Sequence, residues 1–270
     1  MDFNPSQELL SKLITASHIL HHHGVCDAYG HISVRNPYRE SADTFFMPQN
    51  LPPALVTSEE DIVEYNVSDA EPLNRDAPKG YIERNIHAGI YRQYSGVQSV
   101  VHAHAESVVA FTIFPEGTLQ PVYHMAGFLG TKTPTFDIAS VYSEADQQDM
   151  LIRTPPLGDA FSCFFSAPPS SKKNPKPDYS VVLMRGHGFT IAAASIEHAV
   201  VQANFTKANA EIQSKALAAS GGQPLKYLSA HEAHDAWEKA NIDTVERPWS
   251  LWKAEVEQEG SLYSNSLKNG

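Results

Sequence analysis

The sequence has few cysteines and no long apolar run, and these shortages exclude several classes of protein. Its 270 residues include only two cysteines, Cys26 and Cys163, so neither a disulfide framework nor a cysteine-rich zinc site is expected. No stretch reaches the ~18 consecutive apolar residues of a transmembrane helix. The opening residues, MDFNPSQELL, lack the basic and apolar regions of a signal peptide. We therefore expect a cytoplasmic protein with reduced thiols.

Positive charge is also scarce. Twenty Lys and Arg residues oppose 31 Asp and Glu residues, which gives a formal net charge of −11. Such an acidic chain is not expected to bind nucleic acid or anionic membranes. A small anionic substrate stays open, because the charge inside a pocket can oppose the overall sign. We therefore expect a small-molecule substrate.

Strand and helix patterns alternate along the chain. Period-two alternation and short apolar runs predict strands at 31–35, 45–47, 61–67, 97–105, 179–184 and 189–194. Helical periodicity and capping residues predict helices at 6–22, 81–94, 105–114, 143–153, 195–220, 229–240 and 248–258. Several strands adjoin through short turns, which predicts a single-domain α/β protein with α/β/α layers and a central mixed, largely antiparallel sheet. We expect one domain over 1–270, with a core at 8–220 and a C-terminal helical extension at 221–270.

The segment SVVHAHA carries two histidines two residues apart in a predicted buried strand. Alternate side chains of a strand project from the same face, so His102 and His104 lie about 6.6 Å apart along it. This spacing suits two imidazoles that converge on one metal ion. A pair for general catalysis, or two ordinary surface histidines, would show the same pattern. The apolar flanks favour ligands, because a buried imidazole needs a partner.

Two further segments carry candidate site residues. Glu83 and His87 lie one helical turn apart in the predicted helix that precedes this strand. His187 stands between two glycines in RGHGF, at the end of another predicted strand. Glycines let a backbone and a ligand approach closely, and strand ends lead into active-site loops. The alternative for His187 is an ordinary turn residue.

Together these segments resemble the class II aldolase/adducin family. KGYIERNIHAGIYRQYSGVQSVVHAHAESVVAF is similar to its core, in which a helix with a glutamate precedes a strand with V-H-x-H. RGHGF is similar to its G-x-H-G segment, and GHISVR to its early G-N-x-S segment. The resemblance implies a class II aldolase-like fold with His102, His104 and His187 as ligands of a divalent metal ion. It implies Glu83 as the catalytic acid/base, able to move onto the metal when substrate is absent.

The resemblance also implies a cofactor and an assembly. Zinc is expected first, with manganese, iron or cobalt as alternatives, because three imidazoles suit all of them. His87 is expected to orient Glu83 or a ligand, as outer partners of metal sites do. Family members usually assemble as homo-oligomers, so we expect a tetramer or a dimer.

The sequence departs from the sugar-phosphate aldolases where those enzymes hold phosphate. His31 replaces the asparagine of G-N-x-S, and Tyr81-Ile82 replaces a pair of serines. Large side chains cannot replicate a phosphate cradle of hydroxyl and backbone N–H groups. We therefore expect an unphosphorylated substrate.

Two segments indicate a particular branch of the family. GHISVR and PVYHMAGFLG resemble a branch that includes metal-dependent decarboxylases of aromatic or pyridine carboxylates and iron-dependent oxygenases. His31, Ser33 and His124 are accordingly the candidate substrate-binding residues.

The expected function is that of a divalent-metal-dependent lyase. It would cleave a C–C bond, by decarboxylation or retro-aldol reaction, in an unphosphorylated, carboxylate-bearing small molecule through a metal-stabilised enolate. One alternative is an Fe(II)-dependent oxygenase on the same scaffold. Another is a non-catalytic interaction module like the head domain of adducin, which lacks the metal ligands. The presence of Glu83, His102, His104 and His187 favours an enzyme.

Overall fold

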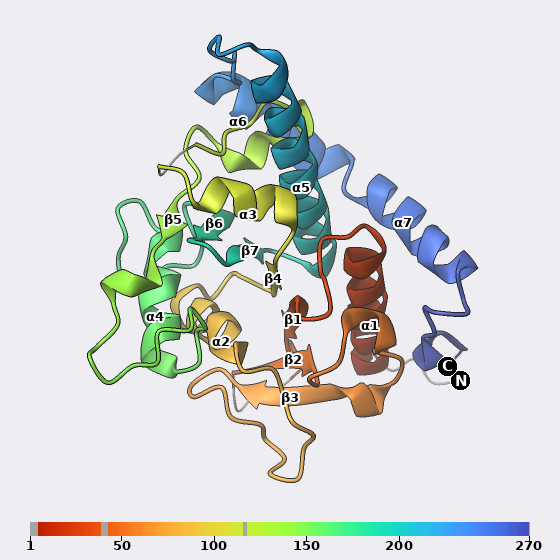
Figure 1. The fold of residues 1–270 in the computed structure, drawn as a ribbon. Coiled ribbons are helices and arrows are strands. Elements are labelled where there is room, and N and C mark those ends of the chain that lie inside the picture. Colours follow the sequence, from red (N-terminus) through yellow and green to blue (C-terminus); the bar gives the residue numbers. More distant parts are fainter. Residues whose placement is uncertain (1–4, 39–42, 116–117, 270) are drawn as a thin grey trace.

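The sheet positions the site. The structure, a computed structural model, describes residues 5–38, 43–115 and 118–269. Within these residues, seven strands form one sheet in the order β3-β2-β1-β4-β7-β6-β5 (Figure 1). The strands are β1 His31–Arg35, β2 Thr44–Pro48, β3 Ile62–Asn66, β4 Ser99–Ala103, β5 Thr135–Phe136, β6 Val181–Met184 and β7 Gly188–Ala193. The pair β5–β6 is parallel and the other pairs are antiparallel, which confirms the predicted mixed, largely antiparallel sheet.

Helices cover both faces of the sheet. Their bounds are α1 Pro5–His22, α2 Arg84–Gln93, α3 Glu106–Thr112, α4 Pro155–Ser162, α5 Ile196–Ala219, α6 Ala230–Asp243 and α7 Glu246–Gln258. One apolar core lies between the sheet and α1, α3, α5 and α7, and a second lies between the sheet and α2 and α4 (Figure 1). Neighbouring strand residues divide between them: Val101 belongs to the first core and Val100 to the second. The α/β/α layering follows from this alternation.

The C-terminal segment, predicted as an extension, contributes two helices. Helix α6 packs on η3, a 3-10 segment over His124–Leu129, and α7 packs on α1 and α5. None of the helices in the described ranges combines the length and the apolarity that crossing a bilayer needs.

The prediction of a helix at 143–153 is wrong. This segment runs as turns and irregular backbone before α4. The carboxylate of Asp146 accepts a hydrogen bond from the backbone N–H of Ser143 at 2.6 Å, so the predicted cap closes a local turn and starts no helix. Met150 adopts a positive φ of 69°, which a continuing helix does not permit. Pro155 and Pro156 then begin α4.

Two boundaries differ from the prediction at the site itself. The helix expected at 81–94 begins at Arg84, with Glu83 at its N-cap position. Strand β4 ends at Ala103, so His104 lies one residue beyond it. Both side chains therefore project from the ends of elements, where the backbone can turn toward a cavity.

Candidate metal centre

Strand register brings the site residues to one face of the sheet. His31 on β1 stands opposite His102 on β4, and His102 stands opposite Thr190 on β7. The residues next to them along the strands, Ile32, Val101 and Ile191, belong to the first core. Alternate side chains of a strand point to opposite faces, so these three side chains lie on the side covered by α2 and α4. His187 lies in the turn of the β6–β7 hairpin. The strand register and the hairpin turn together bring distant histidines to the same end of the central strands β1, β4 and β7.

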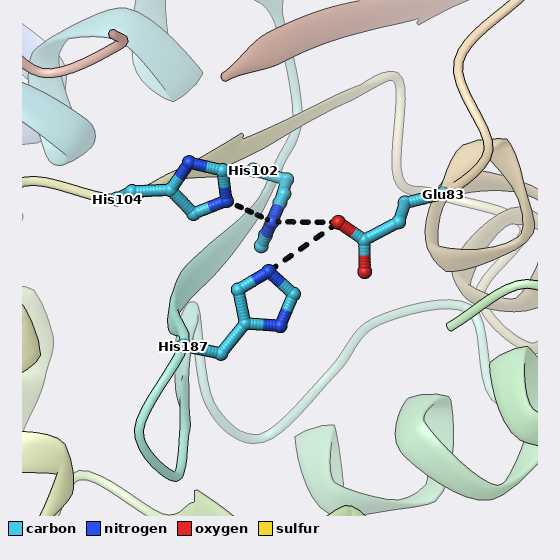
Figure 2. A group of neighbouring side chains, drawn as sticks. All are labelled: Glu83, His102, His104 and His187. Carbon is cyan, nitrogen blue, oxygen red and sulfur yellow. Dashed lines mark hydrogen bonds and ion pairs between the residues drawn. The ribbon is translucent and has the colours of Figure 1, made fainter. Parts of the chain in front are cut away.

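Four side chains that can ligate a metal converge at this end of the strands. One ligand atom from each of Glu83, His102, His104 and His187 lies within 4.8 Å of the others. The Nε2 atoms of His102 and His104 are 2.9 Å apart, and Oε2 of Glu83 lies 3.4 Å from Nε2 of both His102 and His187. Figure 2 shows the three imidazoles and the carboxylate pointing toward one another. The structure thus brings together all four residues singled out in the sequence.

Two of these imidazoles have their outer nitrogens protonated. Nδ1 of His187 lies 3.1 Å from the carbonyl oxygen of Met150. A carbonyl only accepts hydrogen bonds, so this nitrogen carries the proton. Nδ1 of His104 donates in the same way to the carboxylate of Asp27, at 3.2 and 3.3 Å. In the neutral form of each ring, Nε2 then presents a lone pair to the centre of the cluster.

The third imidazole follows the same rule. Nδ1 of His102 lies 3.2 Å from Oγ1 of Thr190, and that hydroxyl donates to the sulfur of Met184 at 3.5 Å. The Thr190 oxygen is thus free to accept from Nδ1 of His102, which leaves Nε2 unprotonated. Three lone pairs and a carboxylate then face one another. Groups of this kind fit a divalent cation, because without one they would be mutually repulsive.

The electrostatics of Glu83 point the same way. Burial alone would raise the pKa of this carboxyl, but His102 and His187 outweigh burial and hold it well below its usual value. Burial lowers the pKa of His187, yet contact with Glu83 overcomes this and raises it. Burial lowers the pKa of His102 to about 4. At neutral pH the cluster therefore contains an ionised carboxylate and a neutral His102, the states in which both groups ligate metals.

Glu83 is anchored on one side only. Its Oε1 accepts a hydrogen bond from the backbone N–H of Ile152 at 3.0 Å, while Oε2 faces the histidines. The irregular segment before α4 therefore serves the site, because Ile152 holds Glu83 and Met150 holds His187.

A cavity of about 500 Å³ opens over the cluster. Glu83, His104 and His187 line it, together with His31. Its other lining residues are aromatic, apolar or polar: Tyr29, Asn50, Lys79, Tyr81, Ile82, Leu151 and Gly186. A small molecule in this cavity would meet the cluster directly.

The remaining predicted residues fall in three different places. His31 lines the cavity. Ser33 and His87 lie beneath it, fully buried and hydrogen-bonded to each other at 2.6 Å, so Ser33 is not among the residues that line the cavity. His124 is exposed at the start of η3 and is also absent from the cavity lining. The structure brings His31 to the cluster and does not bring Ser33 or His124 to the cavity.

The sequence patterns do not predict the residues that hydrogen-bond to Nδ1 of the three histidines, which we call the outer partners: Asp27, Thr190 and Met150. Asp27 had a local signal: its carboxylate accepts from the backbone N–H groups of Tyr29 and Gly30, each at 2.8 Å, as aspartate does at turns. That signal predicts a turn and says nothing of His104. Thr190 and Met150 reach the site through sheet register and an irregular segment, which have no local pattern.

The layered fold and the cluster define the class of the protein, an α/β protein with a candidate metal centre beneath an open cavity. The chain belongs to the class II aldolase and adducin N-terminal domain family, whose model matches residues 11–214. It is 47% identical over 269 residues to the decarboxylase tropJ of Talaromyces stipitatus, covering 97% of this chain and 98% of that protein. It is 29% identical over 192 residues to the 3,4-dihydroxyphthalate decarboxylase of Arthrobacter keyseri, covering 70% of each.

Solved structures agree on the fold. An aldolase II superfamily protein from Pseudomonas syringae superposes with a TM-score of 0.74 at 20% identity, covering 97% of each chain. The family and the named decarboxylases make the chain a carbon–carbon lyase. The alternative of a non-catalytic interaction module is thereby set aside.

Proposed function

We propose that this lyase is a metal-dependent decarboxylase of a small, unphosphorylated aromatic carboxylate. One observation carries the proposal: three imidazole lone pairs and the Glu83 carboxylate converge beneath a cavity. The two named decarboxylases among its relatives favour decarboxylation over retro-aldol cleavage. His102, His104 and His187 would hold the ion, with zinc first and manganese, iron or cobalt as alternatives. When bound, the ion supplies a Lewis acid that stabilises developing negative charge.

The cavity walls suit an aromatic acid. Tyr29, Tyr81, Ile82 and Leu151 offer flat and apolar surface, which favours a ring. Lys79 also lines the cavity and supplies a positive charge for a carboxylate. A phosphate cradle of small hydroxyl side chains is not among the lining residues described. We therefore propose a ring that bears a carboxylate, and the dihydroxylated substrate in the name of one relative favours a hydroxyl on that ring.

Glu83 would move the proton in this reaction. Its ionised Oε2 faces the cluster, so it can take the proton of a substrate hydroxyl. Glu83 then gives this proton to the ring carbon that bears the carboxylate. The C–C bond breaks, CO2 leaves, and the electron pair of that bond restores the aromatic ring and the negative charge on the oxygen. A solvent proton then restores the hydroxyl. Oε1 stays bonded to Ile152, which keeps the carboxylate oriented throughout.

Two further properties belong to the same proposal. We propose a cytoplasmic enzyme, on the basis of the reduced thiols Cys26 and Cys163. We also propose a homo-oligomer, a tetramer or a dimer, on the basis of the family resemblance.

Metal analysis and gas measurements test the proposal. Protein purified without chelator should contain about one divalent ion per chain and release CO2 from hydroxylated benzoates without consuming O2. His102→Ala should lose both the ion and the activity, whereas His234→Ala, at an exposed histidine of α6, should keep both. Stoichiometric O2 uptake would instead establish the oxygenase alternative. Full CO2 release by metal-free protein would refute the metal centre.

A further inference from the structure

A chain of four buried side chains runs from the cavity into the core. Nδ1 of His31 lies 2.8 Å from Nε2 of His87. Nδ1 of His87 lies 2.6 Å from Oγ of Ser33, which lies 2.7 Å from the hydroxyl of Tyr91. All four residues are at most 3% exposed. Of these four residues, only His31 is among the described residues that line the cavity.

The inner end of the chain decides the direction of its hydrogen bonds. Ser33 has one proton and two partners, so it donates to one of them and accepts from the other. If Ser33 donated to Tyr91, the buried hydroxyl of Tyr91 would need another acceptor for its own proton. In the part of the chain that the structure describes, the acceptor within hydrogen-bond distance of this hydroxyl is Ser33. A buried hydroxyl without an acceptor costs about 1–3 kcal/mol. Tyr91 therefore donates to Ser33, and Ser33 donates to His87.

This direction determines both histidine tautomers. His87 accepts at Nδ1, so its proton is on Nε2 and is donated to Nδ1 of His31. His31 must then carry its own proton on Nε2, the ring nitrogen left for the cavity. Both rings are buried and their hydrogen-bond partners in the chain carry no negative charge, so each ring is neutral, because a buried charge needs a charged partner.

We propose that His31 is a specificity-determining residue whose Nε2–H binds an oxygen atom of the substrate inside the cavity. His87, Ser33 and Tyr91 act as positioning residues that hold His31 in the tautomer that donates. The inference rests on the proposed function, because it takes the neighbouring cluster to hold a divalent ion that binds another oxygen of the same molecule.

The position of His31 defines the class of substrate. The ring centroids of His31 and His102 are 5.2 Å apart, and the two residues are direct partners across β1 and β4. An oxygen held by His31 is therefore a close neighbour of an oxygen held in the cluster. Two oxygens on adjacent carbons satisfy both contacts, as in a catechol or an ortho-hydroxylated ring. A substrate with one isolated oxygen would leave the His31 N–H unpaired.

Catechol and phenol are probes that differ in this second oxygen. We expect zinc-loaded protein to bind catechol more tightly than phenol in calorimetric titrations. His31→Phe should weaken catechol binding about tenfold, the effect of losing one hydrogen bond to oxygen, and should leave phenol binding within about twofold. Ser33→Ala should reduce the preference for catechol, because His31 is then less firmly held in one tautomer.

Ser99→Ala is the matched control. Ser99 is also a fully buried serine, and its hydroxyl donates to the backbone carbonyl of Ser33 at 2.8 Å without joining the chain of side chains. It should leave the preference unchanged. A full catechol preference in zinc-loaded His31→Phe would overturn the inference and leave the metal centre intact. Zinc binding that survives His102→Ala would instead refute the proposed function.

Nuclear magnetic resonance gives a second readout that needs no substitution at His31. In protein with 15N-labelled histidine, coupling across the N–H···N hydrogen bond identifies the pair His87 and His31. The proton of this bond should belong to Nε2 of His87, and Nε2 of His31 should also be protonated, with or without zinc. In Ser33→Ala a second tautomer should appear. A proton on Nδ1 of His31 in the wild-type protein would overturn the inference.

Discussion

At the scale of single residues, Asp27 is the outer partner whose charge matters most to the cluster. Its carboxylate accepts the Nδ1 proton of His104 while also closing a turn with Tyr29 and Gly30. Asp27→Asn keeps an oxygen for the turn and removes the charge. Because outer partners of this kind make the ligand more basic, we expect metal affinity to fall about 10- to 100-fold. Competition with a chelator of known affinity measures the change.

Asp159→Asn serves as the control for this prediction. Asp159 is another exposed aspartate, paired with Arg92, and it is not among the residues of the cluster or the cavity. Its substitution should leave metal affinity unchanged. Equal affinities of Asp27→Asn and the wild-type protein would show that His104 needs no charged partner.

The candidate ligands could be predicted at this scale because their signals are local. H-x-H on a strand and a histidine between two glycines are patterns within a few residues. The hydrogen-bond partners of the same histidines have no such signal, since Thr190 meets His102 only through the register of β4 and β7. Ser33 shares a strand face with His31, but the sequence does not reveal that His87 covers it.

At the scale of elements, the contact between α2 and α4 depends on two glycines. A Cβ at Gly158 would lie 2.3 Å from the carbonyl oxygen of Asn85, and one at Gly89 would lie 2.4 Å from the carbonyl oxygen of Gly158. Backbone atoms cannot move aside as a flexible side chain can. Gly158→Ala must therefore push α4 away from α2, and we expect it to lower the free energy of unfolding by about 1–3 kcal/mol. Urea denaturation measures this loss.

The same displacement should reach the active site. Glu83 occupies the N-cap position of α2, and its Oε1 accepts a hydrogen bond from the backbone N–H of Ile152, three residues before α4. We expect Gly158→Ala to reduce kcat as well as stability. Gly260→Ala is the control, because a Cβ there meets only an ordinary contact at 3.7 Å. A Gly158→Ala protein with unchanged stability would show that the helices separate at no cost.

Most elements could be predicted because their apolar periodicity is strong. Strand β5 has only two residues, too short for any period. The segment 143–153 has a good helix start, but Met150 and Ile152 direct their backbone groups to His187 and Glu83. Tertiary hydrogen bonds at the site outweigh a local preference there. The error in the prediction thus falls on a segment that serves the function.

At the scale of the whole molecule, buried neutral histidines make stability depend on pH. His18, His31, His87 and His102 are at most 3% exposed, and burial lowers the pKa of each. His18 lies away from the cluster, on α1, where Nε2 donates to the carbonyl oxygen of Val56 at 2.7 Å. It can therefore report the effect of burial without involving the metal.

The pH dependence of unfolding tests this view. Burial lowers the pKa of His18 from 6.5 to about 4, so between these values the unfolded chain binds a proton that the folded protein does not. The contribution of His18 to the free energy of unfolding is complete well above pH 6.5 and falls as the pH is lowered toward 4. From pH 7.5 to 5.5 the loss from His18 alone should be about 1 kcal/mol.

His18→Phe keeps an aromatic ring beside Tyr263, whose ring centroid lies 5.2 Å from that of His18, and removes the titration. Urea denaturation at saturating zinc should show a decrease between pH 7.5 and 5.5 that is about 1 kcal/mol smaller than in the wild-type protein. His234→Phe, at an exposed position, should show the wild-type decrease. If His18→Phe lost as much stability as the wild-type protein, His18 would have to be protonated in the folded state. Its hydrogen bond to Val56 does not require that charge, because a neutral Nε2–H also donates to a carbonyl.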